Sequence, residues 1–333
     1  MTITHIENFF TNFSFFLLFC MMLYYWIKTS FFSKASNFSF GFYGMFLSNI
    51  SLSILLTIRW VNSTHLPLSN LYESLIFLTW SITLIQIIVQ KTSGLDFLGI
   101  VLCPLALFIF GFASFSLPAE IQGITPLVPA LQSNWLLMHV TVMILSYGTL
   151  LCGCVLSITY LFLNTEISSV FKKIKKQVNF FSSKELISNS SLSEISVIQN
   201  SKNFSLENNQ AFFQIQPGTF FGNAWGDFQF KLDNLSYRII GIGFSFLTIG
   251  ILSGAVWANE TWGSYWSWDP KETWAFITWL IFAIYLHSRL NYGWQGKKPA
   301  IIASIGFMVI WICYLGVNLV GKGLHSYGWI QFS

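Results

Sequence analysis

Residues 257–274 have the sequence WANETWGSYWSWDPKETW and lie between apolar segments of membrane-spanning length. Six of the chain's 14 tryptophans lie between Trp257 and Trp279. Trp and Tyr are common at membrane interfaces, because each ring has an apolar body and a polar group that can stay in water. An interfacial belt explains two or three such rings, but not this density around an Asp-Pro-Lys-Glu core. A flat aromatic surface with a few charges suits a large planar ligand with acidic edges, which indicates haem.

The composition of the whole chain predicts an integral membrane protein. Of its 333 residues 54% are hydrophobic and only 9% are charged, whereas about a quarter of the residues of a soluble domain are charged. A membrane span needs about 20 apolar residues, and its backbone must satisfy its own hydrogen bonds. We therefore predict an all-α polytopic membrane protein with about eight transmembrane helices. The predicted spans are 9–27, 42–60, 71–89, 96–114, 135–163, 237–258, 273–290 and 299–320.

The distribution of Lys and Arg predicts which side of the membrane each loop occupies. If the tryptophan-rich stretch is outside, fourteen of these residues are inside, and only Arg59, Lys271 and Lys322 are outside. Without the long loop the ratio is six to three in the same direction. Positive residues collect on the inner side of membrane proteins, so we expect the tryptophan-rich stretch and both termini outside.

A polar segment between the apolar spans divides the chain into three predicted parts. Residues 1–163 hold five spans, residues 164–235 form a polar loop on the inner side, and residues 236–333 hold three spans with the tryptophan-rich loop. The first part of the polar segment, 166–210, is rich in Ser, Asn and Lys and predicts a solvated, partly flexible loop. The aromatic residues of 222–238 indicate packing at the membrane interface.

Three histidines are candidate ligands, because an imidazole inside a membrane needs a partner or a function. His139 lies about 7 Å into the fifth span, and His325 follows the eighth span, so both can flank the tryptophan-rich loop. Two neutral imidazoles on opposite faces of a ring can ligate haem iron. His287 lies about 21 Å along the seventh span, near its inner end. The alternative for each is a packed histidine bonded to a backbone carbonyl, and His65 is interpreted as a loop residue.

The charged residues of two motifs also have purely structural interpretations. Asp269 and Glu272 have the pattern of a helix start, with Asp as N-cap and Pro at the first turn. This interpretation does not exclude haem contact by Asp269, and Lys271 could pair with a haem propionate. Asn70 and Glu73 likewise have the spacing of an N-terminal cap, which leaves a haem contact of Glu73 open.

Other functions are disfavoured by what the sequence lacks. The five cysteines form no Cys-x-x-Cys pair and no Cys-x-x-Cys-His haem attachment site. No Asp or Glu lies in the middle of a span, as proton-coupled transporters usually require. The sequence also lacks the Asp-rich diphosphate-binding pattern that a membrane lipid transferase would need. Nothing in it indicates a nucleic-acid partner.

The motif Trp262-Gly-x-x-Trp266-x-Trp268-Asp269-x-Lys271-Glu272 resembles the tryptophan-rich "WWD" signature of haem-handling proteins in cytochrome c maturation. Within that group it is most similar to the CcsA family of system II, plastid type. Four further segments resemble this family: 70–74, 232–238, 285–289 and 323–326.

The resemblance implies a haem-handling subunit of a cytochrome c synthase. Haem b would be held at His287, with a second ligand from a CcsB- or ResB-like membrane protein. It would then reach an outer site with His139 and His325 as axial ligands and with Trp262, Trp266, Trp268, Asp269 and Lys271 around it. There it would be attached through thioether bonds to the Cys-x-x-Cys-His motifs of apocytochromes c, such as cytochrome f and soluble c-type cytochromes.

The resemblance also implies a plastid thylakoid membrane with the loop in the lumen, or alternatively a bacterial cytoplasmic membrane. A haem-delivery protein of the CcmC or CcmF type, without synthase activity, is the alternative function. Whether the chain is an enzyme by itself or part of one stays open.

Overall fold

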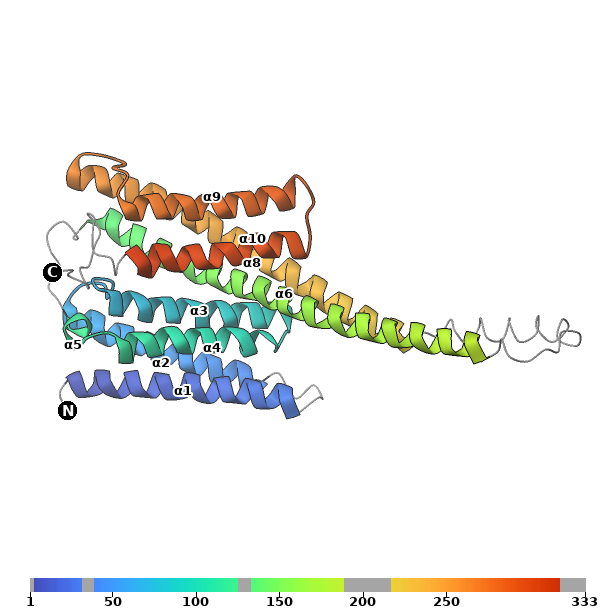
Figure 1. Ribbon diagram of the computed structural model, residues 1–333. Helices are drawn as coiled ribbons and strands as arrows, with labels where there is room; N and C mark the ends of the chain where they lie inside the picture. The colour runs from blue at the N-terminus through green and yellow to red at the C-terminus, as the bar shows by residue number, and fades with distance from the viewer. Residues whose placement is uncertain (1–2, 32–38, 125–132, 189–216, 318–333) are drawn as a thin grey trace, which may run out of the picture.

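The computed structural model describes residues 3–31, 39–124, 133–188 and 217–317, and every regular element in these ranges is helical (Figure 1). Long helices lie side by side as a bundle, and the described connections 64–70, 94–97, 263–269 and 291–296 are short. The predicted all-α membrane fold is confirmed. The elements are α1 (Ile3–Phe31), α2 (Ser39–Ser63), α3 (Leu71–Ser93), α4 (Leu98–Gly111) with the π-helical turn η1 (Phe112–Ser116), α5 (Ala119–Gln122), α6 (Asn134–Ser188), α8 (Pro217–Trp262), α9 (Pro270–Leu290), and α10 (Lys297–Trp311) with the π-helical turn η4 (Ile312–Gly316).

Seven of the eight predicted spans correspond to helices of the described ranges that are long and apolar enough to cross a membrane. The remaining predicted span, 273–290, is the 21-residue helix α9. Its Trp, Thr, His and Arg residues make α9 less apolar than the other seven, although Figure 1 shows it beside α10 and parallel to the bundle axis. The predicted helix is present, and its crossing of the membrane stays a prediction.

Two groups of helices make up the bundle. Helices α1–α4 pack together, and α6, α8, α9 and α10 form the second group; α3 packs against α6 and joins the two. Polar side chains connect neighbours inside the first group: Asn49 Nδ2 donates to Thr83 Oγ1 at 2.8 Å, and Tyr25 Oη donates to Gln90 Oε1 at 3.1 Å. Hydrogen bonds of this kind help helices to associate in lipid, where the hydrophobic effect does not drive them together.

The polar segment 164–235 differs from the prediction of a loop. Helix α6 continues without a break to Ser188, and α8 already begins at Pro217. Figure 1 shows both helices extending beyond the rest of the bundle. The sequence contains the reason: Ile167, Phe171, Ile174, Val178 and Phe181 recur at intervals of four and three residues, which is the helical period. The frequent Lys and Ser residues of this segment led to the prediction of a loop in spite of the helical period. Residues 189–216 of the predicted loop lie outside the described ranges.

One end of the bundle collects the features that the sequence singled out. Helices α3, α6 and α9 begin there and α2, α8 and α10 end there, so the connection 263–269 shares that end with the start of α6 (Figure 1). We call it the loop end. Arg59 and Lys271 lie at the loop end, whereas Lys28, Lys91 and Arg289 lie at the opposite end. The bundle thus separates the positive residues as the predicted orientation requires.

Candidate functional site

The tryptophan-rich loop, residues 263–269, is closed at both ends by local backbone chemistry. Gly263 ends α8 with a φ of 71°, a left-handed conformation that glycine adopts without strain, and its N–H donates to Asn259 O at 3.0 Å. Asp269 is the N-cap of α9, Pro270 occupies the first turn, and Glu272 completes a capping box. The predicted helix start at Asp269 is confirmed, and it fixes where the loop must stop.

Glu272 also organises the loop itself. Its carboxylate accepts hydrogen bonds from the backbone N–H of Ser267 at 2.8 Å and of Asp269 at 3.3 Å. Between these two donors Trp268 has a φ of 59°, a left-handed conformation that costs a non-glycine residue on the order of 1 kcal/mol. The capping contacts therefore hold Trp268 in a strained backbone conformation, with 69% of its surface exposed.

The aromatic rings in the loop and at the adjoining end of α8 meet edge to face. Trp257 and Trp262 have ring centroids 4.8 Å apart at an interplanar angle of 74°, and Trp266 and Trp268 lie 5.9 Å apart at 87°. Trp266 also contacts Phe276 of α9 in the same manner. The rings therefore form walls at right angles to each other, unlike the flat floor that the sequence suggested. Trp262 and Trp266 are half-buried, whereas Trp268 and Tyr265 are exposed.

Lys271, in the first turn of α9, lies near Cys313 of η4, the turn that follows α10. Burial lowers the pKa of Lys271 from 10.5 to about 8, and the neighbouring Cys313 thiol and Asp269 carboxylate oppose this shift. A cation that is partly removed from water attracts an anionic group strongly, because the solvent screens it less. Lys271 therefore has the charge and the surroundings to bind a carboxylate ligand.

We expect Lys271→Met to raise stability at pH 7 by about 1–2 kcal/mol, since it removes a charge whose burial is unfavourable. Because the pKa of Lys271 is lower in the folded protein, the unfolded chain binds more protons between about pH 8 and 10.5. The stability of the wild type therefore rises over this range relative to the variant. Melting temperatures of both proteins without ligand, at about pH 7 and about pH 9.5, check this: the difference should shrink, and a pH-independent difference would contradict the assignment.

His139 packs against α8 near the loop end. Its Nδ1 lies 2.6 Å from the carbonyl oxygen of Gly250, and its ring fills the space beside Gly254. His139 is the sixth residue of α6, as the sequence predicted. Its neighbour Gly254 lies eight residues before Trp262, or about 12 Å along α8, so the ring is near the loop end. The predicted packing alternative, a bond to a backbone carbonyl, is thus present. This bond does not exclude metal ligation, since an imidazole has a second nitrogen.

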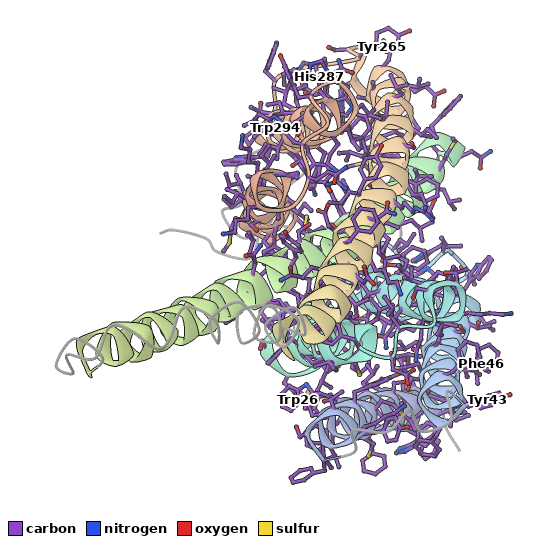
Figure 2. All side chains as sticks on the ribbon, turned by 90° about the vertical axis from the view of Figure 1, so that its right-hand side faces the viewer. Trp26, Tyr43, Phe46, Tyr265, His287 and Trp294 are labelled. Atoms are coloured by element: carbon purple, nitrogen blue, oxygen red, sulfur yellow. The ribbon has the colours of Figure 1, made fainter. Side chains whose placement is uncertain are left out.

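His287 lies at the opposite end of the bundle from the loop. It is 17 residues from Pro270, or about 25 Å along α9, and its side chain is exposed. Figure 2, which looks along the helices, shows His287 on the periphery of the second group of helices. Its ring lies 5.8 Å from that of Tyr292, and Asn291 Nδ2 is 3.0 Å from its Nδ1.

The C-terminal end of α9 is tied to α8 by a contact between two of the family-like segments. Arg289 Nη1 donates to Asp233 Oδ2 at 2.6 Å, and the guanidinium stacks 4.7 Å from the ring centroid of Tyr237. Asp233 also accepts from the backbone N–H of Gly296. These contacts fix the helix turn that carries His287, and the sequence alone did not indicate them.

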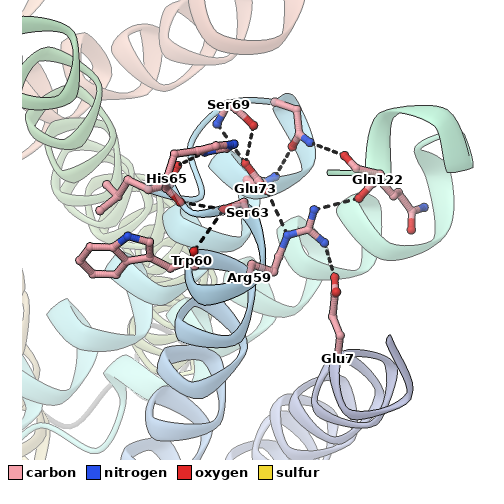
Figure 3. Close-up of polar contacts among 11 residues, drawn as sticks. Glu7, Arg59, Trp60, Ser63, His65, Ser69, Glu73 and Gln122 are labelled. Carbon is pink, nitrogen blue, oxygen red and sulfur yellow. Dashed lines mark hydrogen bonds and ion pairs between the residues drawn. The ribbon is translucent and has the colours of Figure 1, made fainter. Parts of the chain in front are cut away.

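A buried ionic cluster at the loop end was also missed by the sequence analysis. Figure 3 shows the Arg59 guanidinium, which is 2% exposed, between the carboxylates of Glu7 and Glu73 and the carbonyl of Gln122. It also lies 4.8 Å from the ring centroid of Tyr72. The cluster joins α1, α2, α3 and α5, so its evident role is to hold the loop end of the first helix group together.

The predicted cap of α3 is confirmed, and it accounts for the position of Glu73. Asn70 Oδ1 accepts from the backbone N–H of Glu73 at 2.9 Å, and the Glu73 carboxylate accepts from both the N–H and the hydroxyl of Ser69. Glu73 is fully buried, so the structure gives no support to a haem contact. His65 lies in the neighbouring loop between α2 and α3, as predicted.

The structure places the predicted site residues in two regions. Trp262, Trp266, Trp268, Asp269 and Lys271 share the loop end with His139, and His287 lies about 25 Å away. The predicted ligand His325 falls in 318–333, outside the described residues.

Comparisons with known proteins decide the family. The sequence model described as cytochrome C assembly protein matches residues 68–325. The chain is 51% identical to the cytochrome c biogenesis protein CcsA of Chlorella vulgaris over 98% of both chains. The chain belongs to the CcsA family of cytochrome c biogenesis proteins. It is also 50% identical to CcsA of Marchantia polymorpha over 98% of both chains, and 46% identical to CcsA of Gloeothece citriformis over 99% of both.

A solved structure shows that the fold is shared more widely. The cytochrome c haem lyase CcmF matches 94% of this chain with a TM-score of 0.60, but with 14% identity and over only 47% of its own length. This likeness establishes a common helical fold. The CcsA relatives, in contrast, match from end to end, so the predicted family is confirmed.

Proposed function

We propose that this protein is the haem-handling subunit of a cytochrome c synthase, which carries haem through the membrane and presents it at the loop end. One observation carries the proposal: the tryptophan-rich motif forms an ordered loop with an exposed Trp268, at the same end of the bundle as His139. Membership of the CcsA family supports the same conclusion.

The outer site would take haem b as its cargo. His139 and His325 are the proposed axial ligands, and the walls formed by Trp262, Trp266 and Trp268 suit the faces and edges of a porphyrin. Such ring contacts contribute about 1 kcal/mol each beyond burial. Lys271 has the charge to pair with a propionate, with Asp269 beside it. Haem supplies the vinyl groups that react with cysteine thiols, and this chain supplies binding and orientation.

The proposal includes two haem sites, because the two groups of predicted haem-binding residues lie at opposite ends of α9. His287 and the loop lie about 25 Å apart along this helix, too far for both to contact one haem. We propose that His287 binds haem before it reaches the outer site. The exposure of His287 suits a second ligand from a CcsB- or ResB-like membrane protein.

The proposed substrates are apocytochromes c with Cys-x-x-Cys-His motifs, such as cytochrome f and soluble c-type cytochromes. The similarity to algal, plant and cyanobacterial relatives supports a plastid thylakoid membrane with the loop in the lumen. The delivery role of a CcmC- or CcmF-type protein is less well supported, since the chain spans only about half of CcmF.

Visible absorption spectra of the purified protein test the proposal. We expect His139→Ala and His325→Ala each to retain haem but to lose the spectrum of iron with two imidazole ligands, because one axial ligand is removed. His65→Ala, a loop histidine at the same end, serves as the control and should keep the wild-type spectrum. Unchanged spectra in both ligand variants would overturn the assignment of the outer site.

A further inference from the structure

We infer that Gly250 and Gly254 of α8 are positioning residues that hold His139 in the tautomer and orientation that bind haem iron through Nε2. This inference rests on the proposed function, in which His139 is an axial ligand. It adds a second element to the outer site, because α8 then takes part through its backbone and not only through the loop that follows it.

The hydrogen bond of His139 determines the tautomer. Nδ1 lies 2.6 Å from the carbonyl oxygen of Gly250, which can only accept, so Nδ1 carries the proton. In a neutral imidazole the lone pair is then on Nε2, the nitrogen that can coordinate a metal. Ligating histidines in proteins are commonly oriented in this way, by a carbonyl or carboxylate that accepts from the other ring nitrogen. The Gly250 carbonyl also accepts from Ser253 Oγ at 2.9 Å, which helps to fix its direction.

The His139 ring occupies space that a side chain at position 254 would fill. A Cβ built on Gly254 would lie 2.5 Å from both Nδ1 and Cε1 of His139 and 3.2 Å from Cγ. These distances are far below van der Waals contact, and the imidazole is a rigid ring with no flexible end that could bend away. Any side chain at this position must therefore move the ring and weaken its bond to Gly250.

Gly250 brings the two helices close enough for this bond. A Cβ on Gly250 would lie 2.6 Å from Sδ of Met143, which is four residues after His139 on α6. Small residues four apart let membrane helices approach closely. The same spacing here also positions the imidazole, because the Gly250 carbonyl accepts its hydrogen bond and Gly254 leaves room for the ring.

The chain offers a matched control in the same helix. Gly241 of α8 would place a Cβ with no heavy atom within 4 Å. Gly241→Ala and Gly254→Ala make the same chemical change, and both favour the helix locally. The two variants therefore differ in what the added methyl group meets, which is open space in one case and the His139 ring in the other.

The test compares haem spectra and melting temperatures of the full-length purified protein. We expect Gly254→Ala to bind haem and to show the altered axial spectrum of His139→Ala, whereas Gly241→Ala keeps the wild-type spectrum. We also expect a lower melting temperature for haem-free Gly254→Ala, which the double variant His139→Ala/Gly254→Ala should recover, because the ring that the methyl group displaces is gone. This recovery supports the inference even if Gly254→Ala alone folds poorly.

The outcomes separate the inference from the proposed function. If His139→Ala alters the spectrum but Gly254→Ala does not, the role of the glycines is overturned and His139 remains a ligand. A double variant no more stable than a poorly folded Gly254→Ala would also overturn it. If His139→Ala leaves the spectrum unchanged, both the inference and the ligand role of His139 fall.

Discussion

Replacing His287 with alanine should remove most of the haem that purifies with this protein, a decrease of roughly tenfold or more, since each lost factor of ten corresponds to about 1.4 kcal/mol of binding. Among the described residues, His287 is the histidine at the end of the bundle opposite the loop end, where the proposed first haem site lies. Loss of an iron ligand there should stop haem from reaching the loop end as well. Haem content per protein, measured after detergent extraction, checks this.

Ile284→Ala is the matched control for this experiment. Ile284 lies one turn before His287 on α9 and is 56% exposed, so its truncation changes the same helix surface without removing a ligand. It should leave haem content unchanged. His287→Gly should regain haem when imidazole is added to the buffer, because the exposed position admits a free ligand. Wild-type haem content in His287→Ala would refute the inner site.

Arg59→Met should lower the stability of the protein by about 3–5 kcal/mol, because it leaves the carboxylates of Glu7 and Glu73 without their cation. Glu73 is fully buried, so its charge cannot be compensated by water. We expect a drop in melting temperature of about 10 °C and less protein in the membrane. Lys91→Met, which removes an exposed cation at the opposite end, should have little effect.

A charge-neutral combination separates the lost ion pair from lost packing. Arg59→Met combined with Glu7→Gln and Glu73→Gln removes all three charges, so it should be more stable than Arg59→Met alone. A single Arg59→Met variant that melts like the wild type would show that the cluster is not needed to hold α1, α2 and α3 together. A combination less stable than the single variant would show that packing, and not charge, is responsible.

Local signals in the sequence predicted the features that depend on neighbours along the chain. The N-caps at Asn70 and Asp269 follow from residues three positions apart. Apolar length located most span ends to within about five residues, although the helix Gly226–Trp262 starts 11 residues before the predicted span 237–258. The helical period of 167–181 was equally local, but a composition rich in Lys and Ser led to the prediction of a loop. That error came from weighing composition above periodicity.

Contacts between distant segments could not be predicted in this way. The carbonyl that orients His139 lies 111 residues further along the chain, and Glu7 and Arg59 are 52 residues apart. Depth in a helix gave the position of His139 but not the direction of its ring. The edge-to-face arrangement of Trp266 and Trp268 likewise depends on a loop conformation that Glu272 imposes, and a count of tryptophans does not contain it.

A structure of the haem-loaded protein would show where the iron lies and which side chains bind it. We expect iron at the loop end, bonded to Nε2 of His139 on one face and to His325 on the other, with the porphyrin against Trp262, Trp266 and Trp268. His139 Nδ1 should keep its bond to the Gly250 carbonyl. Haem bound elsewhere, or the two imidazoles turned away from each other with no haem between them, would contradict it.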